Sequence, residues 1–197
     1  MHKKKRFLFT ILPIFSLLII LSACGQQELE DPLGWEVNAF EYTTQSNEQL
    51  SLADMEGEVW LADFIFTSCN TVCPPMTRNM AKLQKQLEEE GLDVKIVSFS
   101  VDPEVDTPEK LQSFAEKHGA DLSNWSFLTG YEMEDIKTFA EDSFKTPVSK
   151  PEGEDQVTHG TSFYLIDQNG VVQKRYNGNK DVPYEQIVEG AKITANQ

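Results

Sequence analysis

The stretch FIFTSCNTVCPPM, residues 64–76, joins three patterns in a short space. An apolar run that begins at Val59 ends here and is followed by two cysteines, Cys69 and Cys73, with three residues between them. Pro74 and Pro75 come next and suit the first turn of a helix, where no amide donor is needed. The stretch therefore predicts a buried strand, then a loop with two thiols, then the beginning of a helix.

This placement explains why the thiols would be reactive. Open α/β sheets bind their ligands at the carboxyl ends of strands. A helix N-terminus favours thiolate over thiol, and a thiolate is both a nucleophile for disulfide exchange and a ligand for soft metals. A purely structural disulfide between Cys69 and Cys73 would close only a very short loop and would constrain the unfolded chain little. Redox chemistry and metal binding both remain open.

The rest of the chain continues the alternation of strands and helices. Apolar and β-branched runs predict strands over residues 59–66, 94–101, 125–128, 161–167 and 171–176, and an N-terminal hairpin of 35–43 with 49–52. Helical spacing and caps predict helices from Cys73 to Gly91, after Asp106 or Thr107 up to Gly119, over 132–144 and over 183–192. Residues 145–158 form a polar loop. This order resembles a thioredoxin-like α/β fold, with a central mixed sheet flanked by helices.

The first 23 residues have the pattern of a secretory signal, with basic residues 1–6, apolar residues 7–20 and the small residues that precede Cys24. LSAC, residues 21–24, resembles a bacterial lipobox, which implies cleavage before Cys24 and lipidation of that cysteine. The alternative is an uncleaved transmembrane anchor, but the apolar run is short for a full span. We expect a tether over 24–34 and one domain over 35–197 on the extracytoplasmic face of the cell membrane.

The charge of the chain argues against one class of partner. Four of the 17 Lys and Arg residues lie in the signal and all 32 Asp and Glu residues lie after it, which gives residues 24–197 a formal charge of −19. Phosphate backbones would be repelled, so nucleic acid is not expected as a partner. A basic docking partner is compatible with this charge.

A third candidate residue lies far along the chain. His159 stands just before the strand predicted from Thr161, and in thioredoxin-like folds the loop entering that strand lies beside the cysteine loop. Two cysteines and one histidine suit copper, whereas zinc would accept these ligands but normally takes a fourth. A peroxidase is not indicated, since Ala62 and Phe66 stand where peroxiredoxins carry Pro and Thr or Ser.

Three segments together resemble the SCO (SCO/SenC) family of copper proteins: FTSCNTVCPPM at 66–76, SVDPEVDTPEKL at 100–111 and VTHGTSFYLIDQNG at 157–170. The resemblance implies that Cys69, Cys73 and His159 bind one copper ion, Cu(I) or Cu(II), and that Asp102 lies near the site. It implies a metallochaperone, not an enzyme in the strict sense, that serves assembly of the CuA centre in subunit II of cytochrome c oxidase. A copper donor protein or a thiol reductant would be a further partner.

Other readings of the same residues stay beside this one. The two thiols also suit a thiol–disulfide reductase that keeps the CuA cysteines of the oxidase reduced, and one protein could do both. A redox sensor has no positive support in the sequence. Met76 and Met80 have the spacing of a helical core stripe rather than of copper ligands. His118 precedes Gly119 and is expected only to end a helix.

Overall fold

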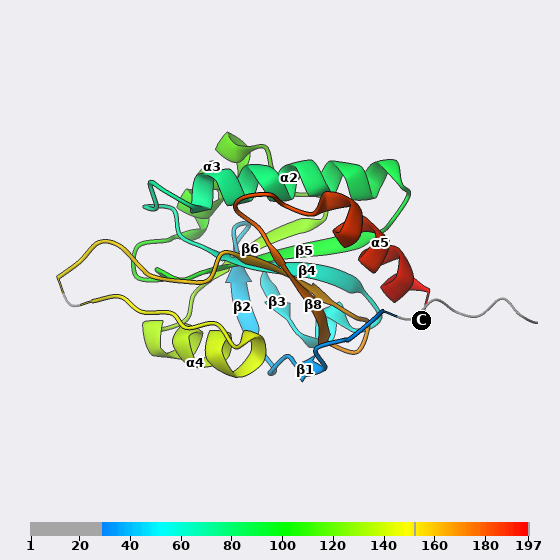
Figure 1. Ribbon diagram of the computed structural model, residues 1–197. Coiled ribbons are helices and arrows are strands. Elements are labelled where there is room, and N and C mark those ends of the chain that lie inside the picture. Colours follow the sequence, from blue (N-terminus) through cyan, green and yellow to red (C-terminus); the bar gives the residue numbers. More distant parts are fainter. Residues whose placement is uncertain (1–28, 152, 197) are drawn as a thin grey trace, which may run out of the picture.

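The computed structural model describes residues 29–151 and 153–196, and its central element is the strand that leads to the cysteines (Figure 1). The strands are β1 (Trp35–Glu36), β2 (Glu41–Thr44), β3 (Gln49–Ser51), β4 (Val59–Ile65), β5 (Val94–Ser100), β6 (Trp125–Thr129), β7 (Ser162–Ile166) and β8 (Val171–Asn177). The helices are η2 (Ala53–Met55), α2 (Cys73–Glu89), α3 (Pro108–His118), α4 (Met133–Phe144) and α5 (Tyr184–Ala195).

The strands form one mixed sheet in the order β1-β8-β7-β4-β5-β6-β2-β3. β4, β5 and β6 are parallel to one another, and the flanking pairs are antiparallel. Helices α2, α3 and α5 cover one face of the sheet and α4 covers the other (Figure 1). The expected α/β architecture of a thioredoxin-like protein, a central mixed sheet flanked by helices, is therefore confirmed.

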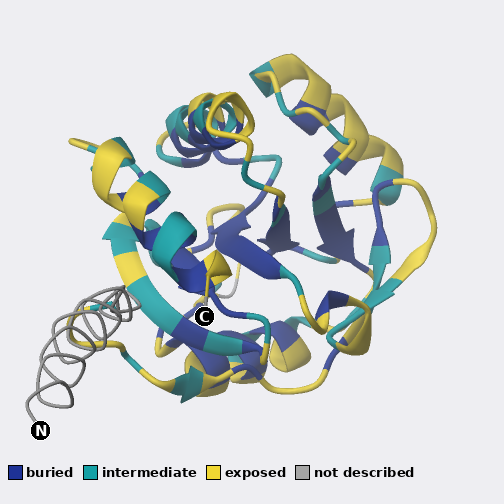
Figure 2. Cartoon of the chain, turned by 90° about the vertical axis from the view of Figure 1, so that its right-hand side faces the viewer, coloured by how far each residue is buried: buried dark blue, intermediate teal, exposed yellow. Residues whose placement is uncertain are grey.

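The two faces of β4 are packed differently. Phe64 points toward α4, where its ring lies 5.3 Å from that of Phe144. On the opposite face α2 contributes a buried apolar stripe that includes Met76 and Met80, which confirms that these methionines belong to the core. Figure 2 shows the result as dark blue strands in the centre of the molecule and yellow on the outer faces of the helices.

One expected element is wrong. The segment 35–43 is not one strand of a hairpin, because β1 pairs with β8 at one edge of the sheet while β2 pairs with β3 and β6 at the other. Between them the chain leaves the sheet, buries Val37 and Phe40, and is held to α4 by the Asn38 amide, which donates to the Ser143 hydroxyl over 3.0 Å. Burial of these two apolar side chains stabilises the fold more than continuing the strand would, so the chain leaves the sheet here. The hairpin of β2 with β3 is confirmed.

The predicted anchor lies outside the described residues. The signal over 1–23 and the lipidated Cys24 fall in the segment 1–28, so the structure does not test them. Within the described ranges, none of the helices combines the length and the apolar character needed to cross a bilayer.

An acidic side chain interrupts the apolar run of β4. Asp63 is fully buried on the face that α2 covers, and its Oδ1 accepts a hydrogen bond of 2.5 Å from the Ser98 hydroxyl. Among the described residues Oδ2 has no partner. Burial raises the pKa of Asp63 to about 6, against the opposing effects of the Ser98 hydrogen bond and of His159.

Asp63 should therefore make the fold less stable as the pH rises. The unfolded chain releases this proton near pH 3.8 and the folded chain near pH 6, so stability is lost across that interval. We expect the free energy of unfolding of Asp63→Asn, relative to wild type, to increase by about 2 kcal/mol between about pH 4 and about pH 8. Denaturant unfolding at several pH values would measure it. Asp142→Asn, at an exposed position of α4, is the control, and equal pH profiles for wild type and Asp63→Asn would contradict the prediction.

Candidate metal and thiol site

The two cysteines occupy the junction between β4 and α2. Cys69 lies in the loop of residues 66–72, here called the cysteine loop, and Cys73 is the first residue of α2. Both are free thiols and both are buried, with exposed fractions of 4% and 0%. The predicted position of the thiols, between a strand end and a helix N-terminus, is confirmed.

The Cys69 sulfur takes the place of a helix cap. Val72, the N-cap residue of α2, makes no side-chain cap, and Pro74 and Pro75 have no amide donors to satisfy. The Cys73 amide donates to Cys69 Sγ over 3.3 Å. A sulfur in this position meets the positive end of the helix, which stabilises a thiolate.

The two thiols titrate very differently. The hydrogen bond from the Cys73 thiol holds the pKa of Cys69 well below its usual value, although burial opposes it. The same hydrogen bond, together with burial, raises the pKa of Cys73 well above its usual value. The reduced pair therefore keeps one proton at neutral pH, with Cys69 as the thiolate. This makes Cys69 the better nucleophile and the readier donor to a soft metal.

His159 lies on the loop that enters β7, as predicted, and reaches the cysteine pair. Its Nε2 is 3.4 Å from Cys73 Sγ, and its ring packs edge-on against Phe66 with centroids 5.7 Å apart. Its Nδ1 is 2.8 Å from the Gly160 carbonyl oxygen, so Nδ1–H donates there and Nε2 presents its lone pair to the sulfurs. A histidine fixed in this way by a backbone carbonyl has the tautomer that metal ligation through Nε2 needs.

The donor set fits copper in its chemistry but is not arranged as a finished cage. In the part of the chain that the structure describes, no three Cys, His, Asp or Glu side chains stand around a common point as a metal would require. The separation of 3.4 Å between Cys73 Sγ and His159 Nε2 nevertheless suits two ligands of one ion, since metal–sulfur and metal–nitrogen bonds of about 2.3 and 2.0 Å at a tetrahedral angle place such atoms roughly 3.5 Å apart. Cys69 Sγ lies beside this pair and accepts from the Cys73 amide over 3.3 Å.

Asp102 does not bond the ligands directly. It follows β5, its side chain is 1% exposed, and its Oδ1 forms an ion pair of 2.7 Å with Lys150 Nζ. Lys150 belongs to the loop that leads to His159. Asp102 is therefore connected to the histidine-bearing loop through the Lys150 side chain.

A second aspartate in the same segment was missed as a site residue. The sequence suggested Asp106 or Thr107 as the cap of α3; the structure assigns the cap to Thr107, whose hydroxyl accepts from the Lys110 amide. Asp106 instead accepts hydrogen bonds from Thr67, two residues before Cys69. The signal was present in the repeated aspartate of SVDPEVDTPEKL, but only the fold brings it to the cysteine loop.

His118 is where the sequence placed it, at the end of α3. Its Nδ1 lies 3.3 Å from Arg78 Nη1 and its ring packs on Phe114. Burial and the neighbouring Arg78 charge lower its pKa. These contacts assign it to the join between α2 and α3 rather than to the thiol site.

Comparisons with known proteins agree with this geometry. The SCO1/SenC family model matches residues 32–194. The crystal structure of a SCO1/SenC family lipoprotein from Bacillus anthracis str. Ames is 54% identical and superimposes with a TM-score of 0.83, over 85% of this chain and 99% of that one. BsSco, a member of the Sco family of cytochrome c oxidase assembly proteins in which a disulfide switch is identified, is 50% identical with a TM-score of 0.80, over 86% and 98%.

A more distant relative has been solved with copper bound. Arabidopsis thaliana ScoI with copper bound is 26% identical with a TM-score of 0.66, over 79% of this chain and 96% of that one. The residues matched by the family model include the cysteine loop and His159. From the match over residues 32–194 and the similarity at 54% identity, we conclude that this chain belongs to the SCO1/SenC family.

Proposed function

We propose that this protein binds one copper ion as cargo through Cys69, Cys73 and His159 and serves assembly of the CuA centre in subunit II of cytochrome c oxidase. The observation that carries the proposal is the contact of 3.4 Å between Cys73 Sγ and His159 Nε2, which joins a sulfur donor at the start of α2 to a nitrogen donor on a loop 86 residues away. Membership of the SCO1/SenC family supports it, as do the copper-bound relative and the oxidase assembly function of BsSco.

The chemistry of the three side chains suits both copper oxidation states. Cu(I) is soft and accepts two thiolates, and Cys69 already carries a low pKa. Cys73 must release its proton when a metal binds, so its raised pKa makes loading costly at low pH. Cu(II) prefers nitrogen donors, and the fixed tautomer of His159 supplies one.

The anchor completes the proposal. We infer that residues 1–23 are removed as a signal, that Cys24 is lipidated, and that 24–34 tether the domain of 35–197 to the extracytoplasmic face of the cell membrane. The LSAC sequence and the lipoprotein from Bacillus anthracis str. Ames, 54% identical, support this. The excess of acidic residues would keep the domain off an anionic membrane surface and favour a basic docking face on its partner.

A second function uses the same sulfurs. A thiolate at Cys69 next to a protonated Cys73 is the arrangement with which a dithiol attacks and then reduces a disulfide, and both thiols are free. The disulfide switch of BsSco, at 50% identity, favours keeping this alternative, in which the protein reduces the CuA-site cysteines of the oxidase. His159 separates the two functions, since copper delivery needs it as a ligand and dithiol exchange does not.

Loss of the imidazole should therefore affect Cu(II) most. In reduced His159→Ala we expect Cu(I) binding to remain, the Cu(II)–thiolate absorption band to be lost, and Cu(II) affinity to fall by roughly 100-fold or more, beyond the typical cost of losing an outer-shell partner. Titration followed by absorption and electron paramagnetic resonance would show it. His118→Ala, which removes the histidine at the end of α3, is the matched control.

Cells complete the test. Oxidase assembly should fail with His159→Ala and proceed with His118→Ala if copper is delivered. Assembly that proceeds normally with His159→Ala but fails with Cys69→Ser would favour the reductase instead. A Cu(II) spectrum of His159→Ala equal to that of wild type would remove His159 from the site.

Oxidation should switch copper binding off. A disulfide between Cys69 and Cys73 offers no thiolate, so the oxidised protein should lose specific copper binding while the reduced protein binds one equivalent. Metal analysis after gel filtration of both forms, with thiol counts, would measure this. One equivalent retained by the fully oxidised protein would place the copper site elsewhere.

The anchor can be tested by removing its cysteine. Cys24→Ala should block lipidation and cleavage at the lipobox, so the variant should be found as the longer precursor instead of the processed lipoprotein, as gel mobility and two-phase detergent partition would show. Wild type should partition into detergent as the processed form. Equal processing and equal partition of the two proteins would contradict a lipoprotein.

A further inference from the structure

We infer that the turn from Asp102 to Asp106 positions both ligand loops of the site, with Asp102 holding the histidine loop through Lys150 and Asp106 holding the cysteine loop through Thr67. The histidine loop is the segment of residues 145–161. The inference deepens the proposed function, because it concerns residues that act through the proposed copper ligands rather than on copper.

The turn lies at the carboxyl end of the parallel strands and is held together by its own hydrogen bonds. Its first carbonyl, that of Asp102, accepts from the amides of Val105 and Asp106 over 3.0 and 2.9 Å. The Ser100 hydroxyl donates to Asp106 Oδ2 over 2.6 Å and accepts from the Asp102 amide over 3.1 Å. Since Ser100 pairs with Ile65 at the carboxyl ends of the parallel strands β5 and β4, the turn lies beside the start of the cysteine loop.

Asp106 anchors the cysteine loop. Its carboxylate accepts from the Thr67 amide over 3.1 and 3.2 Å and from the Thr67 hydroxyl over 2.5 Å. Asp106 is 1% exposed, so these hydrogen bonds satisfy a carboxylate that water does not reach freely. Thr67 is two residues before Cys69, and its position therefore fixes where the loop begins its turn toward α2.

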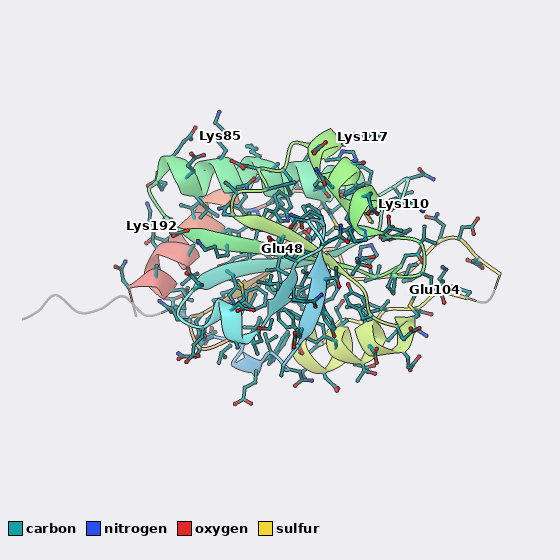
Figure 3. The ribbon with its side chains drawn as sticks, turned by 180° about the vertical axis from the view of Figure 1, so that it is seen from behind. Glu48, Lys85, Glu104, Lys110, Lys117 and Lys192 are labelled. Carbon is teal, nitrogen blue, oxygen red and sulfur yellow. The ribbon has the colours of Figure 1, made fainter. Side chains whose placement is uncertain are left out.

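Asp102 anchors the histidine loop. Its buried Oδ1 lies 2.7 Å from Lys150 Nζ, and Lys150 is also 3.8 Å from Glu104 (Figure 3 shows Glu104 where the histidine loop leaves the body of the molecule). The neighbour of Lys150, Ser149, exchanges backbone hydrogen bonds of 3.0 and 2.8 Å with Thr158. Thr158 directly precedes His159, so the ion pair holds the segment of the loop that carries the imidazole.

The ion pair between Asp102 and Lys150 should resist breaking. A buried carboxylate without its cation is costly, so Asp102 resists release of Lys150. Within residues 29–151 and 153–196, the ion pairs that join the histidine loop to other elements are those of Lys150 with Asp102 and Glu104. The loop is also joined to the cysteine loop by Gln156, whose Nε2 donates to the Ser68 carbonyl over 3.5 Å. Lys150 therefore helps to set the placement of His159 relative to Cys73, beside the packing of the buried Val148 and Val157 of the same loop.

Lys150→Met tests the histidine arm, because it keeps the length of the side chain and removes the amine. In the reduced, metal-free protein we expect the ring proton resonances of His159 to shift as its edge-on contact with Phe66 loosens, and the Thr158 amide to exchange with solvent about tenfold faster or more. Cu(II) should dissociate about tenfold faster or more, as for the loss of an outer-shell partner. Lys150→Arg, which keeps the charge, should restore wild-type behaviour in all three measurements.

Lys192→Met is the matched control. It removes a lysine that forms an ion pair of 2.6 Å with Glu90, the residue that follows α2, and Figure 3 shows Lys192 on another part of the molecule. It should leave His159, Thr158 and Cu(II) dissociation unchanged. Thr67→Val tests the cysteine arm: it should change the alkylation rate of Cys69 by severalfold and leave the His159 ring resonances in place, and Thr67→Ser should restore the rate.

Each outcome decides a separate point. If Lys150→Met leaves the His159 resonances and Thr158 exchange as in wild type, or if Lys192→Met changes them equally, the positioning inference is wrong. If the resonances and exchange change but Cu(II) dissociation does not, the turn positions the loop as inferred, and the proposal that His159 is a copper ligand fails instead. An unchanged Cys69 alkylation rate in Thr67→Val would restrict the inference to the histidine arm.

Discussion

The burial of β4 on both faces is the constraint on which the rest of the structure depends. Every residue of the strand is buried, so helices must cover both sides of the sheet, and the chain can leave β4 only at the open carboxyl end. The cysteine loop begins there, between a rigid strand and a helix N-terminus. Asp63 is the one acidic residue in this otherwise largely apolar strand, and burial raises its pKa to about 6, so that it is mostly protonated below that pH.

The site that results is divided between rigid and adjustable parts. Cys73 is fixed as the first residue of α2, whereas Cys69 and His159 lie on loops that two buried aspartates hold in place. The sulfurs share one proton and can bind a metal or form a disulfide, but not both at once. In the part of the chain that the structure describes, the proposed ligands lie close together without forming a closed metal cage.

Much of the fold could be predicted because local signals agreed with tertiary packing. The apolar run that precedes the cysteines, the helical stripe with Met76 and Met80, and the β-branched run from Val94 each formed an element of the expected type. The segment 35–43 failed because its β propensity was overridden by packing of Val37 and Phe40 under the sheet. No local pattern shows which edge of a sheet a short strand will join.

The sequence by itself determined the chemistry: a thiol pair at a strand end before a helix, a distant histidine, and the resemblance that linked them to copper. Their contact was expected only through the family's fold. Only the tertiary structure decided which cysteine is the thiolate, which nitrogen of His159 carries the proton, and that Asp102 and Asp106 contact the two loops. The physical reason is that pKa values, tautomers and buried ion pairs depend on burial and on partners from other segments, and neither can be read from spacing along one chain.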